Sequence, residues 1–352
     1  MKQDIFGLTI TDLEKAFLAL GLKKFRAKQV FQWIYQKSVF DFNEMHNLSK
    51  KDIAILEENF CLLPRRITVL RQQNSADGMT SKLLLSLPDG NSIETVLMHH
   101  DYGYSVCVSS QVGCDMHCAF CASGLNGAIR NLTLPEIVAQ VYLFNERLKP
   151  QGAFVSRIVV MGSGEPMLNY DNVFGALAFL HQESTSFMSY RNMTVSTCGI
   201  IPGIKRMTDD AKPINLAVSL HAVKMDLRSS LMPVNKGFAF TDVLEAAEEY
   251  ALTTGREITY EYILLKDVND SEEDALLLSN FLRYKHATVN LIPANPVPEK
   301  GFARPDEKTI DKFFKILVKN KTNATVRKEM GKDIAAACGQ LRAKFAQEEK
   351  KK

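Results

Sequence analysis

The spacing of hydrophobic and polar positions changes near residue 104, and from there short apolar runs alternate with amphipathic segments. The apolar runs predict strands at 104–110, 157–162, 193–198, 215–221, 257–265, 288–293 and 324–328. Segments such as 134–148 and 242–255 carry apolar residues at helical spacing. Near-continuous apolar strands separated by helices are typical of a parallel sheet covered by helices. The pattern predicts an α/β fold, an incomplete (β/α)6 barrel with functional residues at the carboxyl ends of its strands.

The chain before residue 104 shows a different pattern. Residues 11 to about 60 have apolar positions at helical spacing, with Gly21 as a break between two helices. Two apolar runs within 82–98 then flank Pro88-Asp89-Gly90, a turn sequence that predicts a β-hairpin. We therefore expect an N-terminal helical accessory domain at 1–78, a linking β-hairpin at 79–103, the barrel with its C-terminal segment at 104–345 and a charged tail at 346–352.

Composition sets the class of protein and leaves its partners open. Hydrophobic residues make up 46% and charged residues 24% of the 352-residue chain, which are ordinary values for a globular protein. No window approaches eighteen uninterrupted apolar residues, and the first residues lack the apolar core of a secretion signal. We expect a cytoplasmic protein without membrane contact. The net charge of +3 neither requires nor excludes nucleic acid, because the clustering of charges matters more than their sum.

Four of the seven cysteines lie within residues 107–121, in and directly after the first strand expected for the barrel. Three of them, Cys114, Cys118 and Cys121, have the spacing Cys-x3-Cys-x2-Cys. In a reducing compartment such crowding indicates metal binding or catalysis, and thiolates favour an iron–sulfur cluster, zinc or copper(I). Zinc with His117 as a fourth ligand stays open at this point. Three ligands on a four-iron cluster would leave one iron open for a small molecule.

The cysteine spacing, with Phe120 ahead of the third cysteine, resembles the radical S-adenosylmethionine (SAM) enzymes. This resemblance implies one [4Fe–4S] cluster on Cys114, Cys118 and Cys121, whose open iron binds S-adenosyl-L-methionine. Residues 162–166, Gly-Ser-Gly-Glu-Pro, resemble the superfamily segment that receives the amino group of this cofactor. A glycine there lets the backbone approach a ligand closely. The residues that match cofactor-binding positions are Gly164, Glu165, Ser196, Ser219, Leu220, His221 and Asn295.

Longer segments narrow the resemblance to the bacterial dual-specificity RNA adenine-C2 methyltransferases. They are residues 94–98, 107–114, 219–222, 228–235, 289–298 and 333–344, so the similarity runs nearly end to end. The resemblance implies methylation of carbon 2 of adenosine 2503 in 23S rRNA and of adenosine 37 in certain tRNAs. It also implies a monomer that receives electrons from an external, flavodoxin-like one-electron donor. This chain departs from the family pattern at Ser163, Cys198 and Ala335, where methionine, serine and aspartate are usual.

The chemistry explains why such a family needs two further cysteines. Carbon 2 of adenine is electron-poor and does not attack a sulfonium methyl group, so the methyl must first be carried on a protein sulfur. The resemblance assigns this S-methylcysteine to Cys338 and makes Cys107 the second cysteine, which forms a transient disulfide with Cys338. It makes Glu94 the proton acceptor, and a carboxylate on an apolar strand needs such a reason because unpartnered burial is costly. Whether Glu94 or Cys107 removes the carbon-2 proton stays open.

Two other functions are compatible with parts of this pattern. The related adenine-C8 methyltransferases of 23S rRNA, which confer antibiotic resistance, share the plan of catalytic cysteines. A zinc-stabilised RNA-binding protein without catalysis would need only the cysteine loop and basic residues. Basic residues that could contact RNA phosphates are Arg65, Arg66 and Arg71, together with four residues of the accessory helices, Lys23, Lys24, Arg26 and Lys28. Those four residues fit a solvated helix face equally well.

Overall fold

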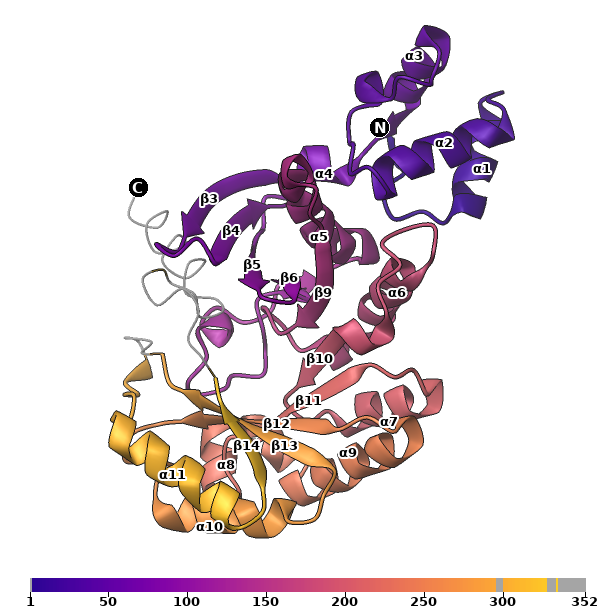
Figure 1. Ribbon diagram of the computed structural model, residues 1–352. Coiled ribbons are helices and arrows are strands. Elements are labelled where there is room, and N and C mark those ends of the chain that lie inside the picture. Colours follow the sequence, from indigo (N-terminus) through magenta and orange to yellow (C-terminus); the bar gives the residue numbers. More distant parts are fainter. Residues whose placement is uncertain (1, 296–299, 328–333, 335–352) are drawn as a thin grey trace.

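A ten-stranded sheet forms the centre of the molecule in the computed structural model, which describes residues 2–295, 300–327 and 334 (Figure 1). The strand order is β14-β13-β12-β11-β10-β9-β6-β5-β4-β3. The strands from β6 to β14 in this order pair in parallel. They are β6 (Gly103–Cys107), β9 (Val155–Val160), β10 (Met193–Thr197), β11 (Asn215–Ser219), β12 (Ile258–Leu264), β13 (Ala287–Pro293) and β14 (Asn323–Val326). Each expected strand of the barrel is therefore confirmed.

Helices connect successive parallel strands and cover the outer side of the curved sheet, which is open on one side in Figure 1. They are α5 (Leu134–Leu148), α6 (Tyr170–His181), α7 (Ile201–Asp210), α8 (Met225–Leu231), α9 (Phe240–Thr254), α10 (Glu272–Leu282) and α11 (Glu307–Lys319). Helix α5 begins where it does because Thr133 and Glu136 form a reciprocal capping box around its first turn. The predicted partial (β/α) barrel is confirmed, with β14 as a further parallel strand at its edge.

The predicted hairpin is present, but it is part of the main sheet. Strands β4 (Thr80–Ser86) and β5 (Ser92–His100) pair antiparallel around the Pro-Asp-Gly turn, and β5 continues the sheet by pairing with β6. A further strand, β3 (Thr68–Asn74), pairs with β4 at the edge of the sheet. Residues 68–74 fall inside the segment expected for the accessory domain. Only Val69 and Leu70 of these seven residues are apolar, so the sequence carries little strand signal here.

The N-terminal helices α1 (Ile10–Ala19), α2 (Lys24–Tyr35), α3 (Lys50–Asn59) and α4 (Leu63–Arg66), with the short pair β1 (Gln3–Asp4) and β2 (Phe60–Cys61), form the accessory region. Gly21 separates α1 from α2 with a φ of +73°, as the sequence predicted. Aromatic rings pack this region on the barrel helices. The Tyr35 ring lies 5.3 Å from that of Tyr142 on α5 and 5.0 Å from that of Phe179 on α6. Helices long and apolar enough to cross a membrane are absent from the described residues.

Candidate active site

The strand register places the predicted side chains of several strands on one face of the sheet. Directly paired residues point to the same face, and so do residues two apart on one strand. Cys107 at the end of β6 pairs with Val96, two residues after Glu94. On the other side of β6, strand pairing continues through β9 to β10 and β11. This pairing places Ser196 and Ser219 on the same face of the sheet as Cys107. These side chains line the inner face, because the helices cover the opposite one.

The three clustered cysteines lie on a loop that β7 (Gln111–Val112) and β8 (Arg130–Asn131) close at its base. Gly113 is required at the start of this loop, since a Cβ there would lie 1.9 Å from the carbonyl oxygen of Gly127. The amide of Ala119 donates to the carbonyl of Leu231, 2.8 Å away, which fastens the loop to helix α8. Burial raises the pKa of the Cys114 thiol to about 11 and that of Cys118 to about 12, and neighbouring thiols add to the effect.

The donor set fits a cluster better than a single ion. Across the described residues, no group of three or more His, Cys, Asp and Glu side chains converges as a single-metal site requires. Zinc needs its thiolates about 2.3 Å from one centre. A [4Fe–4S] cluster instead takes one thiolate on each iron, so its ligands stand further apart. His117, the candidate fourth zinc ligand, is exposed. Three half-buried thiols on one loop match a cluster with one open iron.

Glu165 has its carboxylate inside the protein, where it binds backbone amides. Its two oxygens accept hydrogen bonds from the amide of Cys198, at 2.8 Å, and that of Met167, at 3.1 Å. Burial raises the pKa of this carboxyl, and the Cys198 amide partly offsets the effect. The neighbouring Gly164, with a φ of +109°, leaves no space for a side chain because a Cβ would lie 2.7 Å from Gln111. Glu165 therefore joins the loop after β9 to the end of β10.

His221 holds the end of β11 in a similar way. The side chain is buried, and its Nδ1 accepts the amide of Ile263 on β12 at 3.0 Å. Its ring packs edge to face against Phe120 of the cysteine loop, with 4.8 Å between centroids. Burial, together with the nearby Arg228 charge, lowers the pKa of His221 to about 3. The imidazole is therefore neutral at physiological pH, and it connects two strand ends with the loop that carries the cysteines.

Arg228 on α8 binds the ends of these strands, a role that was not predicted from the sequence. Its guanidinium is fully buried. It donates to the carbonyls of Cys198, Ser219 and Leu220 at 3.0–3.3 Å and to Asn235 Oδ1 at 2.6 Å. Burial lowers the pKa of Arg228 to about 10, so it stays cationic at neutral pH. Four neutral oxygens thus hold one charge beneath the carboxyl ends of β10 and β11.

Two more charged residues of the inner face were missed in the sequence. Glu261 on β12 is buried, accepts a hydrogen bond from Ser196 Oγ at 2.9 Å and lies beside Ser219 in the register. Lys82 on β4 has its Nζ 2.6 Å from Glu94 Oε2. Both residues interrupt apolar strands, which is the signal that singled out Glu94 in the sequence. Applied to every strand, the same criterion would have found them.

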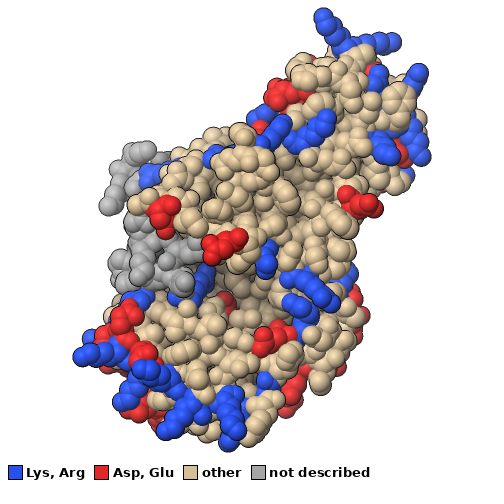
Figure 2. Space-filling model, viewed as in Figure 1, with Lys and Arg blue, Asp and Glu red and all other residues tan. Residues whose placement is uncertain are grey.

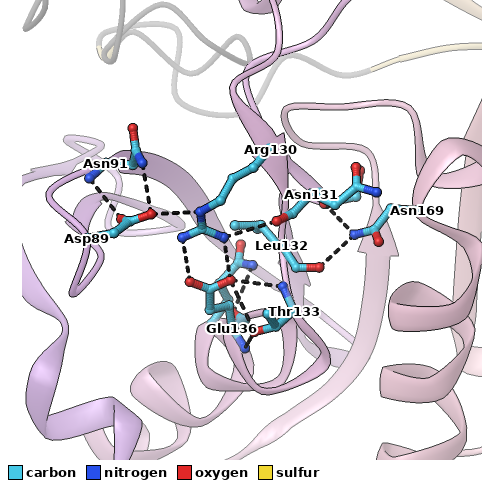
Figure 3. Close-up of polar contacts among 10 residues, drawn as sticks. Asp89, Asn91, Arg130, Asn131, Leu132, Thr133, Glu136 and Asn169 are labelled. Atoms are coloured by element: carbon cyan, nitrogen blue, oxygen red, sulfur yellow. Dashed lines mark hydrogen bonds and ion pairs between the residues drawn. The ribbon is translucent and has the colours of Figure 1, made fainter.

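A polar network joins the base of the cysteine loop to the hairpin that carries Glu94 (Figure 3). Arg130 donates to Asp89 in the hairpin turn at 2.7 Å and binds both carboxylate oxygens of Glu136 on α5. Asn131 and Asn169 extend the network to the segment after β9. Burial alone would raise the pKa of Asp89, but hydrogen bonds from Arg130 and Asn91 lower it to about 2. The loop and the hairpin are therefore fixed relative to each other.

The remaining predicted residues are placed as follows. Cys107 is buried at the end of β6, where Thr95 Oγ1 donates to its carbonyl at 2.9 Å. Leu220 is fully buried and Asn295, just after β13, is exposed. Cys338 and Ala335 lie outside the described residues.

Comparisons with known proteins show which family the chain belongs to. The sequence profile of the radical SAM superfamily matches residues 108–278, and that of the ribosomal RNA large subunit methyltransferase N-terminal domain matches residues 3–62. An Enterococcus faecalis protein named "Probable dual-specificity RNA methyltransferase RlmN" is 46% identical over 358 residues, which cover 100% of this chain and 99% of the relative. The chain belongs to the RlmN family of dual-specificity RNA methyltransferases. Its expected resemblance to that family is confirmed.

A second relative and a solved structure give the same result. A Spiroplasma citri relative of the same name is 46% identical over 340 residues, with 97% of each chain covered. The crystal structure of a radical SAM methyltransferase from Sphaerobacter thermophilus superposes with a TM-score of 0.92 at 42% identity, covering 97% of this chain and 99% of that one. The cofactors of this enzyme are accordingly a [4Fe–4S] cluster and S-adenosyl-L-methionine, and the zinc-stabilised, non-catalytic alternative is wrong.

Proposed function

We propose that this enzyme methylates carbon 2 of adenosine in RNA, at adenosine 2503 of 23S rRNA and adenosine 37 of tRNAs. The observation that carries the proposal is the common inner face of Glu94 and Cys107, next to the cysteine loop. An acceptor for a proton and a second thiol are the two groups that a base joined to a cysteine would need for its release. Membership in the RlmN family supports the choice of RNA as substrate.

The proposed assignment gives each residue one task. When bound, the cluster and its sulfonium ligand supply a methyl group and, by one-electron cleavage, a carbon radical that abstracts hydrogen. Cys114, Cys118 and Cys121 hold the cluster, while Gly164, Glu165, Ser196, Ser219, Leu220, His221 and Asn295 shape the site of the sulfonium ligand. Cys338 accepts the methyl group by displacement and carries it to the base. Cys107 then attacks the Cys338 sulfur, so that a disulfide forms as the carbon–sulfur bond breaks, and the released methylene takes up a proton to become the methyl group of the base. Glu94 takes the carbon-2 proton.

The accessory region supports binding of a large RNA. Figure 2 shows Lys and Arg side chains over these helices, and Lys23 and Lys28 are exposed. Arg26 and Arg65 instead form ion pairs with Asp52, at 3.0 Å, and Glu146, at 3.2 Å. We propose that the exposed lysines contact phosphates, and that the target base is flipped into the barrel, where Glu94 and Cys107 face it. The proposed enzyme is a monomer supplied by an external, flavodoxin-like one-electron donor.

Two variants test the cysteine assignments. Cys338→Ala should never acquire a methyl group, whereas Cys107→Ala should be methylated and then stall as a covalent protein–RNA species, because the resolving thiol is gone. Intact-protein mass spectrometry and gel analysis of the RNA adduct measure both outcomes. Chromatography of digested RNA against 2-methyladenosine and 8-methyladenosine standards identifies the carbon that is modified. Release of product by Cys107→Ala at the wild-type rate would remove Cys107 from the mechanism, and 8-methyladenosine would overturn the carbon-2 assignment.

A further inference from the structure

Lys82 is a lysine with no exposed surface, in a position where the sheet would accept an apolar residue. It lies on β4, whose neighbours Leu83, Leu84 and Leu85 are also fully buried. Lysine is almost never fully buried unless it is paired. Its Nζ lies 2.6 Å from Oε2 of Glu94 on β5, and Glu94 itself is only 5% exposed. Two charges therefore meet inside the protein.

The register places this ion pair beside the second catalytic cysteine. Val96 on β5 is paired with Lys82 on one side and with Cys107 on the other, so the three side chains share the inner face of the sheet. Glu94 is two residues before Val96 on the same face. The pair thus lines the wall of the barrel where the proposed reaction takes place, and the helix-covered face of β4 carries Leu83 and Leu85 instead.

Stability alone does not explain such a pair. Taking two charges out of water costs several kcal/mol for each ion, and apolar residues of similar volume are often as stable in the same place. The neighbouring positions of β4 are leucines, so apolar side chains pack well in this part of the sheet. The ion pair must therefore serve something other than the packing of the sheet.

We propose that Lys82 is a positioning residue for methyl transfer, whose ammonium keeps Glu94 ionised and oriented to accept the carbon-2 proton. This inference rests on the proposed role of Glu94. A buried carboxyl without an opposite charge tends to be protonated, and a protonated carboxyl accepts no further proton. A cation within hydrogen-bond distance of Oε2 favours the carboxylate form of Glu94, which is the form that accepts a proton.

The proton step balances without a change in Lys82. The proton leaves carbon 2 of the base that is joined to the methylene of Cys338, and its bonding electrons stay in the ring. It arrives at a Glu94 oxygen, which becomes a neutral carboxylic acid, while Lys82 keeps its three protons. Loss of this proton together with one electron, which the bound cluster would take back, restores the aromatic ring, so a carboxylate is a strong enough base for the proton. The ammonium next to the neutral acid then favours loss of the proton to solvent, and this restores the carboxylate.

The test is a pH profile of product formation by the cluster-loaded enzyme with its RNA substrate. In Lys82→Met, Cys338 should be methylated at the wild-type rate, while formation of methylated RNA falls about tenfold at pH 7 and the covalent protein–RNA species accumulates. Product formation should recover at higher pH, where Glu94 ionises without help. Lys82→Arg, which keeps the charge, should keep the wild-type profile.

Control variants separate this proposal from the one on which it rests. Glu94→Gln should stall at every pH, and if it forms product normally, the role of Glu94 fails whatever Lys82 does. If Glu94→Gln stalls but Lys82→Met keeps the wild-type profile, the role of Lys82 alone is overturned. Leu84→Val, directly opposite Glu94 in the register, tests for packing effects and should leave the profile in place. If Lys82→Met does not fold, Lys82→Gln, which donates a hydrogen bond without charge, takes its place and should show the same shift.

Discussion

The two halves of the barrel bury charged side chains in different ways. In the parallel half, Glu165 binds backbone amides and Arg228 binds backbone carbonyls and one side-chain amide. In the antiparallel half, Lys82 and Glu94 bind each other, side chain to side chain, on the inner face. A charge bound to the backbone fixes where a strand ends, whereas the two charges of the hairpin half bind each other through their side chains on the inner face. This contrast fits the proposed roles, in which the parallel half shapes the cofactor site and the hairpin half supplies the reacting groups.

The largest expected effect is that of removing the guanidinium of Arg228. Arg228→Met should lower the free energy of unfolding by about 4 kcal/mol or more, because several buried oxygens lose their donor at once. The protein should also retain less iron, since the strand ends beside the cysteine loop lose their common anchor. Anaerobic denaturation and iron analysis measure both effects. Arg283→Ala, which removes an exposed arginine, is the control and should change stability by less than about 0.5 kcal/mol.

The ion pair of the hairpin half should respond differently. Lys82→Met alone should cost about 3 kcal/mol, because Glu94 loses its buried ionic partner and must stay uncompensated or take up a proton. The double variant Lys82→Met with Glu94→Leu should return to within about 1 kcal/mol of wild type, yet form no methylated RNA. Urea denaturation of both variants, beside an activity assay, decides this. A double variant as unstable as the single one would mean that the pair serves the fold, and the contrast between the two halves would disappear.

The smallest effect concerns His221 in the parallel half. Its pKa of about 3 in the folded protein lies below the ordinary value of 6.5, so its stabilisation is complete above pH 6.5 and decreases as the pH falls towards 3. Between pH 7.5 and 5.0 this should cost about 2 kcal/mol of unfolding free energy. His221→Gln should lose this pH dependence, as measured by denaturation at both pH values. His286→Gln, at an exposed position, should keep it, and equal slopes in all three proteins would contradict the assignment.

Sequence patterns predicted the hairpin and the parallel strands because both depend on local features. The turn at Pro88-Asp89-Gly90 and the apolar runs on either side of it are contained within seventeen residues, 82–98. Strand β3 was missed because most of its residues are polar. It forms a strand by pairing with β4, and this pairing is not visible in its own sequence. For Glu165 the resemblance to the superfamily segment implied a role in cofactor binding. Its binding of the Cys198 amide depends on how the ends of β9 and β10 are placed.

The sequence by itself determined the cysteine loop, the order of strands and helices, and the family, because spacing and periodicity are properties of neighbouring residues. Only the tertiary structure decided which partners the buried charged side chains bind. Lys82 and Glu94 are twelve residues apart, and a shift of the β4–β5 register by one residue would turn one of them to the helix-covered face. Arg228 likewise reaches the carbonyls of two strands, and only their final spacing makes those oxygens neighbours. Register and strand spacing arise from packing of the whole sheet, so no single segment contains them.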